Sequence, residues 1–200
     1  PDKPEFVLLL NSDTQVYPGA LQALIDYLED HPEAGMVGSR LEDPDGTPQA
    51  STFRFPSLWS ELDEALRIGP IHRLLSRFVT LLPTPTSAAQ VDWVAGASLC
   101  IRREVFDTIG LLDDDYFLYY EETDFCLRAR DLGFATRYVP TSEVTHVGGG
   151  SGRSDLTHQM QILNRVRLYA RRHGRPAAWC YWAATLVSEA SWVARGHRHS

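Results

Sequence analysis

The sequence predicts an α/β fold, a sheet flanked by helices, on three observations. Residues 6–10 form a short, unbroken apolar run, which is the pattern of a strand buried on both faces in a parallel sheet. Leu21, Leu24, Ile25 and Leu28 then repeat at helical spacing. Further short strand patterns and helical patterns follow along the chain, as in folds that place helices over a sheet.

Turn and capping signals set the boundaries of the elements. Pro18 suits the first position of the first helix, and His31-Pro32 stops that helix. Asp43-Pro44-Asp45-Gly46 is a strong turn signal. Further strands are expected at 36–38, 91–95, 98–101 and 135–139. Further helices are expected twice between 55 and 83, with a break at Gly69-Pro70, and at 103–109, 121–132, 155–172 and 177–194.

Composition argues against several classes of protein. The chain has 200 residues and 44% hydrophobic content, which suffices for the core of one domain. Its formal net charge of −7 gives no electrostatic signature of a nucleic-acid binder. Cys100, Cys126 and Cys180 lie far apart without CxxC spacing. They argue against a disulfide framework or a zinc knuckle, and for a reducing compartment.

Asn11-Ser12-Asp13 is the first polar cluster that suggests chemistry. It directly follows the strand at 6–10. In open α/β sheets the carboxyl ends of the strands border the ligand crevice. A carboxylate there can hold a hard divalent cation together with water and phosphate oxygens. The alternative is an Asx-turn that only caps the strand.

The second cluster, Glu121-Glu122-Thr123-Asp124, opens a helix after the aromatic run at 116–120. One of its carboxylates is a candidate general base for an acceptor hydroxyl, and the aromatic rings are candidates for a surface on which a sugar stacks. Burial would raise the pKa of such a base, and the helix dipole would lower it. Acidic residues also favour helix N-termini for purely electrostatic reasons, so a structural role stays open.

His146 is the third candidate, within the glycine-rich stretch at 144–150. Neighbouring glycines would let the backbone and the imidazole approach a phosphate or a metal closely. The alternative is a structural or simply exposed histidine.

Taken together, these blocks resemble the family-2 glycosyltransferases of the GT-A fold, especially their rhamnosyltransferase-like branch. The likeness covers about residues 5–172, and its blocks occur in family order. They are a metal-site strand at 8–14 (LLLNSDT), a middle block at 91–97 (VDWVAGA) with 102–106 (RREVF), a catalytic block at 117–128 (FLYYEETDFCLR), and a closing block of Tyr138-Val139-Pro140 with His146.

The resemblance implies an inverting, single-displacement transfer from a nucleotide-diphosphate sugar. The acceptor would be a hydroxyl of a saccharide or glycolipid in cell-surface polysaccharide assembly, and rhamnose is one candidate sugar. Asp13 and His146 would hold Mg²⁺ or Mn²⁺, which neutralises the leaving diphosphate. The donor would also contact Asn11, Gly96 and Ala97. The base would be Glu122 or Asp124, and the acceptor would lie against Trp93, Phe117, Tyr119, Tyr120 and Glu121.

Three departures from the family pattern modify this expectation. Glu122 stands where the family usually has an aspartate, which leaves open whether Glu122, Asp124 or neither takes the proton. Ser12 stands where the branch often has proline or a second acid. The family's first strands have no counterpart before residue 5. We therefore expect an N-terminally truncated GT-A domain over 1–154 with an exposed apolar sheet edge, followed by a helical tail over 155–200.

Two functions of other classes stay open. The first is a catalytically inactive sugar-binding or scaffold module, which the Glu122 departure favours. The second is a metal-dependent phosphoester hydrolase that uses the same acids. A hydrolase usually has more clustered metal ligands than Asn11, Asp13 and His146 offer.

The tail raises the question of membrane contact. The segment 177–194 is apolar apart from Glu189 and is rich in Trp and Tyr, and arginines crowd before it. At about 18 residues with an internal charge, it is short for a membrane span. Trp and Tyr favour the interface of a bilayer and arginines attract lipid head groups, so peripheral contact at the cytoplasmic face is one expectation. The alternatives are a helix packed on the catalytic domain and a docking surface for another subunit.

Overall fold

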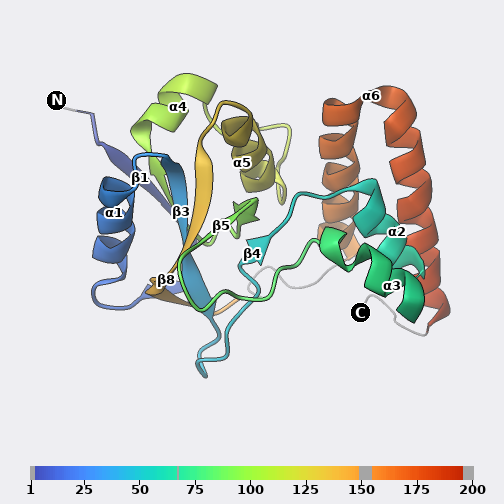
Figure 1. The fold of residues 1–200 in the computed structure, drawn as a ribbon, viewed down its shortest axis with the longest axis horizontal. Helices are drawn as coiled ribbons and strands as arrows, with labels where there is room; N and C mark the ends of the chain where they lie inside the picture. The colour runs from blue at the N-terminus through green and yellow to red at the C-terminus, as the bar shows by residue number, and fades with distance from the viewer. Residues whose placement is uncertain (1–2, 67, 149–154, 196–200) are drawn as a thin grey trace. The chain divides into compact units, whose positions relative to one another are not determined.

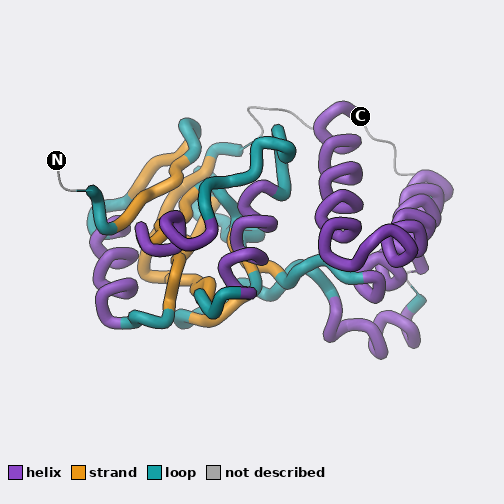
Figure 2. The backbone as a smooth tube through the Cα atoms, turned by 90° about the horizontal axis from the view of Figure 1, so that it is seen from above, coloured by secondary structure: helices purple, strands orange, loops and turns teal. Residues whose placement is uncertain are grey.

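The computed structural model describes residues 3–66, 68–148 and 155–195 (Figure 1). The chain clusters into two compact units, each described by itself. The first comprises residues 1–53, 81–114 and 121–150, and the second comprises 54–80, 115–120 and 151–200. All strands of the described residues belong to the first unit, whereas the regular structure of the second is helical (Figure 2).

A mixed sheet forms the centre of the first unit. Its strands lie in the order β1 (Phe6–Leu10), β7 (Ser98–Arg102), β3 (Ala34–Glu42), β8 (Ala135–His146) and β2 (Thr14–Val16), and β5 (Ala89–Val91) also pairs with β8. β3 and β8 are parallel, whereas the other pairs are antiparallel. A separate two-stranded sheet joins β4 (Thr52–Phe53) to β6 (Trp93–Val94).

The expectation that the first strand is buried between parallel neighbours is wrong. β1 lies at the edge of the sheet, where it pairs antiparallel with β7. Its first four side chains are half-buried and Leu10 is exposed. Within the described residues β1 has no second partner strand, so an apolar sheet edge of the expected kind is present.

Helices cover both faces of the sheet (Figure 1). On one face, α1 (Ala20–Asp30) packs Leu24 against Val37 of β3 and Val139 of β8. On the other face, α5 (Glu121–Asp131) brings Cys126 Sγ to 3.3 Å from Met36 Sδ. Met36 and Val37 face opposite ways because successive side chains of a strand alternate. α4 (Arg103–Ile109) packs beside α5.

β8 is longer than the sequence indicates. A strand was expected only at 135–139, with His146 in a loop, but β8 continues to His146. The pairing register with β3 shifts between Val139 and Glu143, so Pro140 and the next two residues form a bulge. A bulge tolerates a proline because it needs no ladder hydrogen bond there. The strand resumes after the bulge, and His146 therefore ends it opposite Thr14 of β2.

The second unit contains α2 (Leu58–Leu66), α3 (Gly69–Leu75), a 3₁₀ turn η1 (Ser76–Phe78) and α6 (Asp155–Ala194). Gly69-Pro70 open α3, so the predicted break between two helices is confirmed. α6 is interrupted at Gly174, whose φ of 79° and ψ of 172° are not helical, and Pro176 follows. It therefore consists of two arms, residues 155–173 and 175–194, as the sequence predicts.

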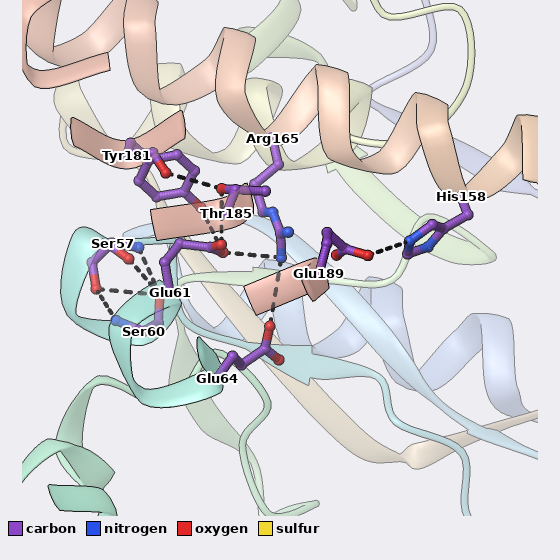
Figure 3. A network of polar contacts seen from close by, with 9 residues as sticks. All are labelled: Ser57, Ser60, Glu61, Glu64, His158, Arg165, Tyr181, Thr185 and Glu189. Carbon is purple, nitrogen blue, oxygen red and sulfur yellow. Dashed lines mark hydrogen bonds and ion pairs between the residues drawn. The ribbon is translucent and has the colours of Figure 1, made fainter. Parts of the chain in front are cut away.

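A buried polar network joins α2 to both arms of α6 (Figure 3). Glu61 of α2 accepts hydrogen bonds of 3.0 Å from Tyr181 Oη and of 3.0 Å from Thr185 Oγ1, both on the second arm. Arg165 of the first arm lies 3.0 Å from the same carboxylate. Glu61 is only 2% exposed, and these contacts offset the free-energy cost of burying its carboxylate.

Candidate active site

The loop Asn11-Ser12-Asp13 connects β1 to β2 at one end of the sheet. A turn does form here, but it closes through the backbone carbonyl of Asn11, which accepts hydrogen bonds from Thr14 N at 3.3 Å and from Thr14 Oγ1 at 2.7 Å. The amide group of the Asn11 side chain lies 3.5 Å from His146 Nε2. The backbone therefore makes the turn, and the side chains of Asn11 and Asp13 remain available to the site.

Strand pairing brings His146 to this loop. Thr14 of β2 pairs with His146 at the end of β8, and Val147 N donates a hydrogen bond of 3.0 Å to the backbone oxygen of Asp13. His146 Nε2 consequently lies 3.5 Å from Asp13 Oδ1. A shared metal ion, as the family resemblance implies, requires these two groups to lie near each other, and this proximity is observed.

Gln49 fixes which nitrogen of His146 carries the proton. The Gln49 amide donates hydrogen bonds of 2.7 Å to the backbone oxygen of His146 and of 2.7 Å to Asp43 Oδ1. Its Oε1 atom can only accept, and it lies 2.9 Å from His146 Nδ1. Nδ1 therefore holds a proton, and in the neutral imidazole the lone pair of Nε2 is directed toward Asp13 and Asn11.

Neither Gln49 nor the role of Asp43 follows from the sequence. Asp43 reads only as part of the predicted turn, which is present with Gly46 N bonded to Asp43 O at 2.8 Å. A glutamine in a loop carries no signal of its own, because its partner His146 lies far away in the chain.

The donor atoms fit a divalent cation. A carboxylate oxygen and a neutral imidazole nitrogen that bind one ion at about 2.1 Å each lie about 3 Å apart. Asp13 Oδ1 and His146 Nε2 are 3.5 Å apart, so a small closure brings them to that spacing. Oxygen with a single nitrogen suits Mn²⁺ or Mg²⁺, with water and phosphate oxygens as further ligands.

Glu122 lies in the first turn of α5, beside the segment Gly96-Ala97. A Cβ added at Gly96 would lie 3.6 Å from Glu122 Cβ, and Ala97 O accepts a hydrogen bond of 3.0 Å from Asn11 N. Gly96-Ala97 thus links Glu122 to the loop that carries Asp13. Gly96 and Ala97, the predicted donor contacts, therefore lie between the predicted base and the predicted metal ligands.

The carboxyl of Glu122 is in an environment that favours its protonated form. The residue as a whole is partly exposed, but its Oε2 atom is buried and has no hydrogen-bond partner within the described residues. Burial, and then the neighbouring charge of Glu121, raises the pKa of Glu122 to about 7. Burial thus outweighs the backbone hydrogen bonds that lower the pKa, and the resulting pKa is near that of an efficient general base at neutral pH.

Asp124 is engaged elsewhere. Its Oδ2 atom accepts a hydrogen bond of 2.7 Å from Arg128 Nε. The same guanidinium donates to the backbone oxygens of Ile109 at 2.8 Å and Leu111 at 2.9 Å. Asp124 therefore helps to tie α5 to the end of α4 and the residue pair that follows it, and the geometry favours Glu122 over Asp124 as the base.

The predicted acceptor residues are divided between the units. Trp93 stacks on Phe53 in the first unit, with ring centroids 4.1 Å apart. Glu121 begins α5, and burial raises the pKa of its carboxyl. The other predicted contacts, Phe117, Tyr119 and Tyr120, belong to the second unit.

The aromatic segment of the second unit has an unusual backbone. Tyr119 and Tyr120 have φ angles of 67° and 75°, which non-glycine residues rarely adopt. Asn164 supports this conformation by donating hydrogen bonds of 2.9 Å to Leu118 O and 3.0 Å to Tyr119 O. The sequence gives no signal for this role of Asn164, since the residue lies in an ordinary helical pattern.

Comparison with known proteins decides the family. The family model described as "Glycosyltransferase like family 2" matches residues 2–175. The chain belongs to this family. Since the match begins at residue 2, it gives no support to the expected loss of the first strands.

Relatives of this family member include bacterial rhamnosyltransferases. The chain is 32% identical over 203 residues to the N-acetylglucosaminyl-diphospho-decaprenol L-rhamnosyltransferase of Mycobacterium tuberculosis, covering 96% of this chain and 61% of that protein. It is 28% identical to rhamnosyltransferase WbbL of Escherichia coli, over 86% of this chain and 67% of that protein. The chain therefore spans about three fifths of the length of the mycobacterial relative.

A solved structure confirms the fold. The crystal structure of GalNAc-T7 with UDP, GalNAc and Mn²⁺ matches with a TM-score of 0.53 at 17% identity, covering 94% of this chain and 38% of that chain. At this identity the likeness shows the fold alone. The predicted GT-A architecture, a mixed α/β sheet flanked by helices, is confirmed.

Proposed function

We propose that this family member carries the catalytic centre of an inverting, metal-dependent rhamnosyltransferase. It would move L-rhamnose from a nucleoside-diphosphate donor to a hydroxyl of a saccharide or glycolipid, in the assembly of a cell-surface polysaccharide. The names of the relatives support the sugar and the kind of acceptor. One observation carries the proposal: Asp13 Oδ1 lies 3.5 Å from the Nε2 atom of a His146 whose tautomer is held by Gln49.

The metal ligands act on the donor. Asp13 and His146 would hold the cation, and Gln49 would keep the imidazole in the form that can bind it. Bound Mg²⁺ or Mn²⁺ supplies positive charge that stabilises the nucleoside diphosphate as it leaves. Asn11 and the backbone of Gly96-Ala97 would position the donor beside this site.

Glu122 acts on the acceptor. Its ionised carboxylate removes the proton of the acceptor hydroxyl while that oxygen attacks the anomeric carbon from the face opposite the leaving diphosphate. A single displacement of this kind inverts the anomeric configuration, and the proton remains on Glu122 at the end of the step. A pKa of about 7 makes Glu122 a stronger base than an ordinary carboxylate.

The test is a transfer assay with the full-length protein. Labelled nucleoside-diphosphate L-rhamnose is offered with a polyprenyl-diphospho-N-acetylglucosamine acceptor. We expect labelled lipid product that is lost with EDTA and restored by Mn²⁺. Asp13→Ala should abolish both metal-supported donor binding and transfer. The matched control is Asp26→Ala, because among the described residues the Asp26 side chain bonds only to its helix neighbour Gln22, at 2.7 Å.

Two outcomes would contradict the proposal. Free rhamnose released in the absence of acceptor would indicate a hydrolase. Donor binding without turnover of any acceptor, in the presence of Mn²⁺, would indicate a sugar-binding or scaffold module.

A further inference from the structure

The second arm of α6, residues 175–194, carries an apolar stripe on its outside. Trp179, Trp182, Leu186 and Val193 follow one another at spacings of three, four and seven residues, so they lie on one face of the helix. They are 69%, 39%, 48% and 59% exposed. We name these four residues the outer stripe. Exposed alanines at 183 and 190 continue its apolar surface.

The inward face of the same arm is polar, which reverses the usual arrangement of an amphipathic helix. Tyr181, Thr185 and Ser188 are buried, and the first two bond to Glu61 of α2 (Figure 3). Glu189 pairs with His158 of the first arm, Oε2 to Nε2, at 2.9 Å. These contacts set the rotation of the arm, so the outer stripe cannot turn inward without breaking a buried network.

Apolar grooves extend the surface on both sides of the outer stripe. One groove borders the first arm, and the other borders α2. The first is lined by Val166, Arg175, Ala178, Trp179 and Trp182. The second is lined by Leu58, Leu62, Ala65, Leu66, Cys180, Ala183, Ala184 and Val187. A stripe of four exposed apolar side chains that continues into two apolar grooves is typical of an interaction site.

The charge around the outer stripe is opposite to that of the protein. The whole chain has a net charge of −7, whereas residues 171–199 contain five arginines and one glutamate. That glutamate, Glu189, is the one paired with His158. Arg172 is exposed at the end of the first arm, Arg175 at the start of the second, and Arg195 directly after it. Arg171 is paired with Asp115, so it adds less to the positive field.

We infer that the outer stripe is a docking surface for a bilayer containing anionic phospholipids, with the second arm lying in the plane of the membrane. Tryptophans flanked by arginines suit the level of the lipid head groups, with Trp179 and Trp182 reaching toward the acyl chains. Within the described residues no helix has the length and apolarity needed to cross a bilayer, so contact through these helices would be peripheral.

A second copy of the chain fits this surface less well. Arginines stand at both ends of the arm, so either a parallel or an antiparallel pairing would bring positive charges together. An anionic lipid surface complements both ends at once. This inference does not depend on the proposed transfer reaction, and its test uses no substrate.

The test is vesicle flotation of the full chain. The protein should float with vesicles of phosphatidylglycerol and phosphatidylethanolamine but not with phosphatidylcholine alone, and salt should weaken the binding. Trp179→Ser with Trp182→Ser should lower binding at least about tenfold. The control is Leu132→Ser, which removes a leucine that is 60% exposed in the first unit and should bind normally. Arg172→Gln with Arg175→Gln should weaken binding, whereas Arg73→Gln, at an exposed arginine of α3, should not.

A conservative variant keeps the test decisive if the serine variant does not fold. Trp179→Phe with Trp182→Phe should still float, but its fluorescence should lose most of its quenching by brominated phosphatidylglycerol. Wild-type protein that does not float, or quenching that survives in the Phe variant, would overturn the inference. So would a dimer in analytical ultracentrifugation that the Ser variant dissociates without any vesicle binding by the wild type.

Discussion

His146 donates a hydrogen bond from Nδ1 to the side-chain oxygen of Gln49, 2.9 Å away. Gln49 is itself held by Asp43 and by the backbone of His146, so its amide has one orientation that satisfies all its partners. This contact leaves the other imidazole nitrogen as an acceptor beside Asp13. The proposed metal ligand His146 is therefore held in one orientation by Gln49.

Removal of Gln49 should weaken metal binding without unfolding the protein. Loss of a residue that orients a histidine ligand typically costs about 10–100-fold in metal affinity. We expect Gln49→Ala to weaken Mn²⁺ binding by that factor, measured by isothermal titration calorimetry with a nucleoside diphosphate present. Gln90→Ala, at an exposed position of β5, is the matched control and should bind Mn²⁺ normally. Equal affinities in the two variants would contradict the role of Gln49.

Glu122→Gln should separate donor binding from turnover. The amide cannot accept the acceptor proton, so kcat should fall by at least about 10²-fold while donor binding is retained. In the wild type, kcat/KM should fall as the pH is lowered through about 7, because the base is then protonated. Near-normal turnover by Glu122→Gln would exclude Glu122 as the base.

The same group should make stability depend on pH. The pKa of Glu122 is raised from 4.5 in the unfolded chain to about 7 in the fold. Between these two pKa values the folded state binds more protons than the unfolded chain does. The stabilisation that the protonated Glu122 gives the fold is therefore complete below the pKa of the unfolded chain, and it is lost as the pH rises through the pKa of the folded state. Glu122→Gln should remove this dependence. We expect the melting temperature of the wild type to fall relative to Glu122→Gln between about pH 5 and pH 8, and parallel curves would contradict the assignment.

Most helices could be predicted from sequence, because helices and the turns between them depend on local patterns. The break at Gly174-Arg175-Pro176 and the turn at 43–46 are examples, as each rests on glycine or proline. The family resemblance identified the blocks that hold Asp13, Glu122 and His146.

Long-range pairing could not be predicted. An apolar run such as 6–10 looks the same in a central strand and in an edge strand that packs on a helix, and β1 is the latter. Pro140 and its bulge interrupt the strand pattern in the middle of β8, so the sequence predicts a loop at His146. The roles of Gln49 and Asn164 could not be predicted for a related reason, because their hydrogen-bond partners lie 97 and 45 residues away in the chain.

Close packing behind the site gives a prediction about stability. A Cβ at Gly38 of β3 would lie 2.5 Å from Val94 Cγ2 and 2.7 Å from Val94 Cβ, so the strand or β6 would have to move. We expect Gly38→Ala to lower the free energy of unfolding by about 1–3 kcal/mol, measured by urea denaturation. Gly96→Ala is the comparison, since its nearest contacts at 3.6 Å are ordinary. A Gly38→Ala protein as stable as Gly96→Ala would show that the sheet is less tightly packed here.

The central claim is that Asp13 and His146 hold one divalent cation, and pulsed electron paramagnetic resonance of bound Mn²⁺ tests it most directly. The measurement uses the full-length protein with Mn²⁺ and a nucleoside diphosphate, and it detects nitrogen coupled to the metal. We predict ¹⁴N modulation from a single imidazole in the wild type. It should be lost in His146→Ala and retained in His158→Ala, whose histidine pairs with Glu189. Bound Mn²⁺ without nitrogen coupling in the wild type, or with unchanged coupling in His146→Ala, would contradict the account.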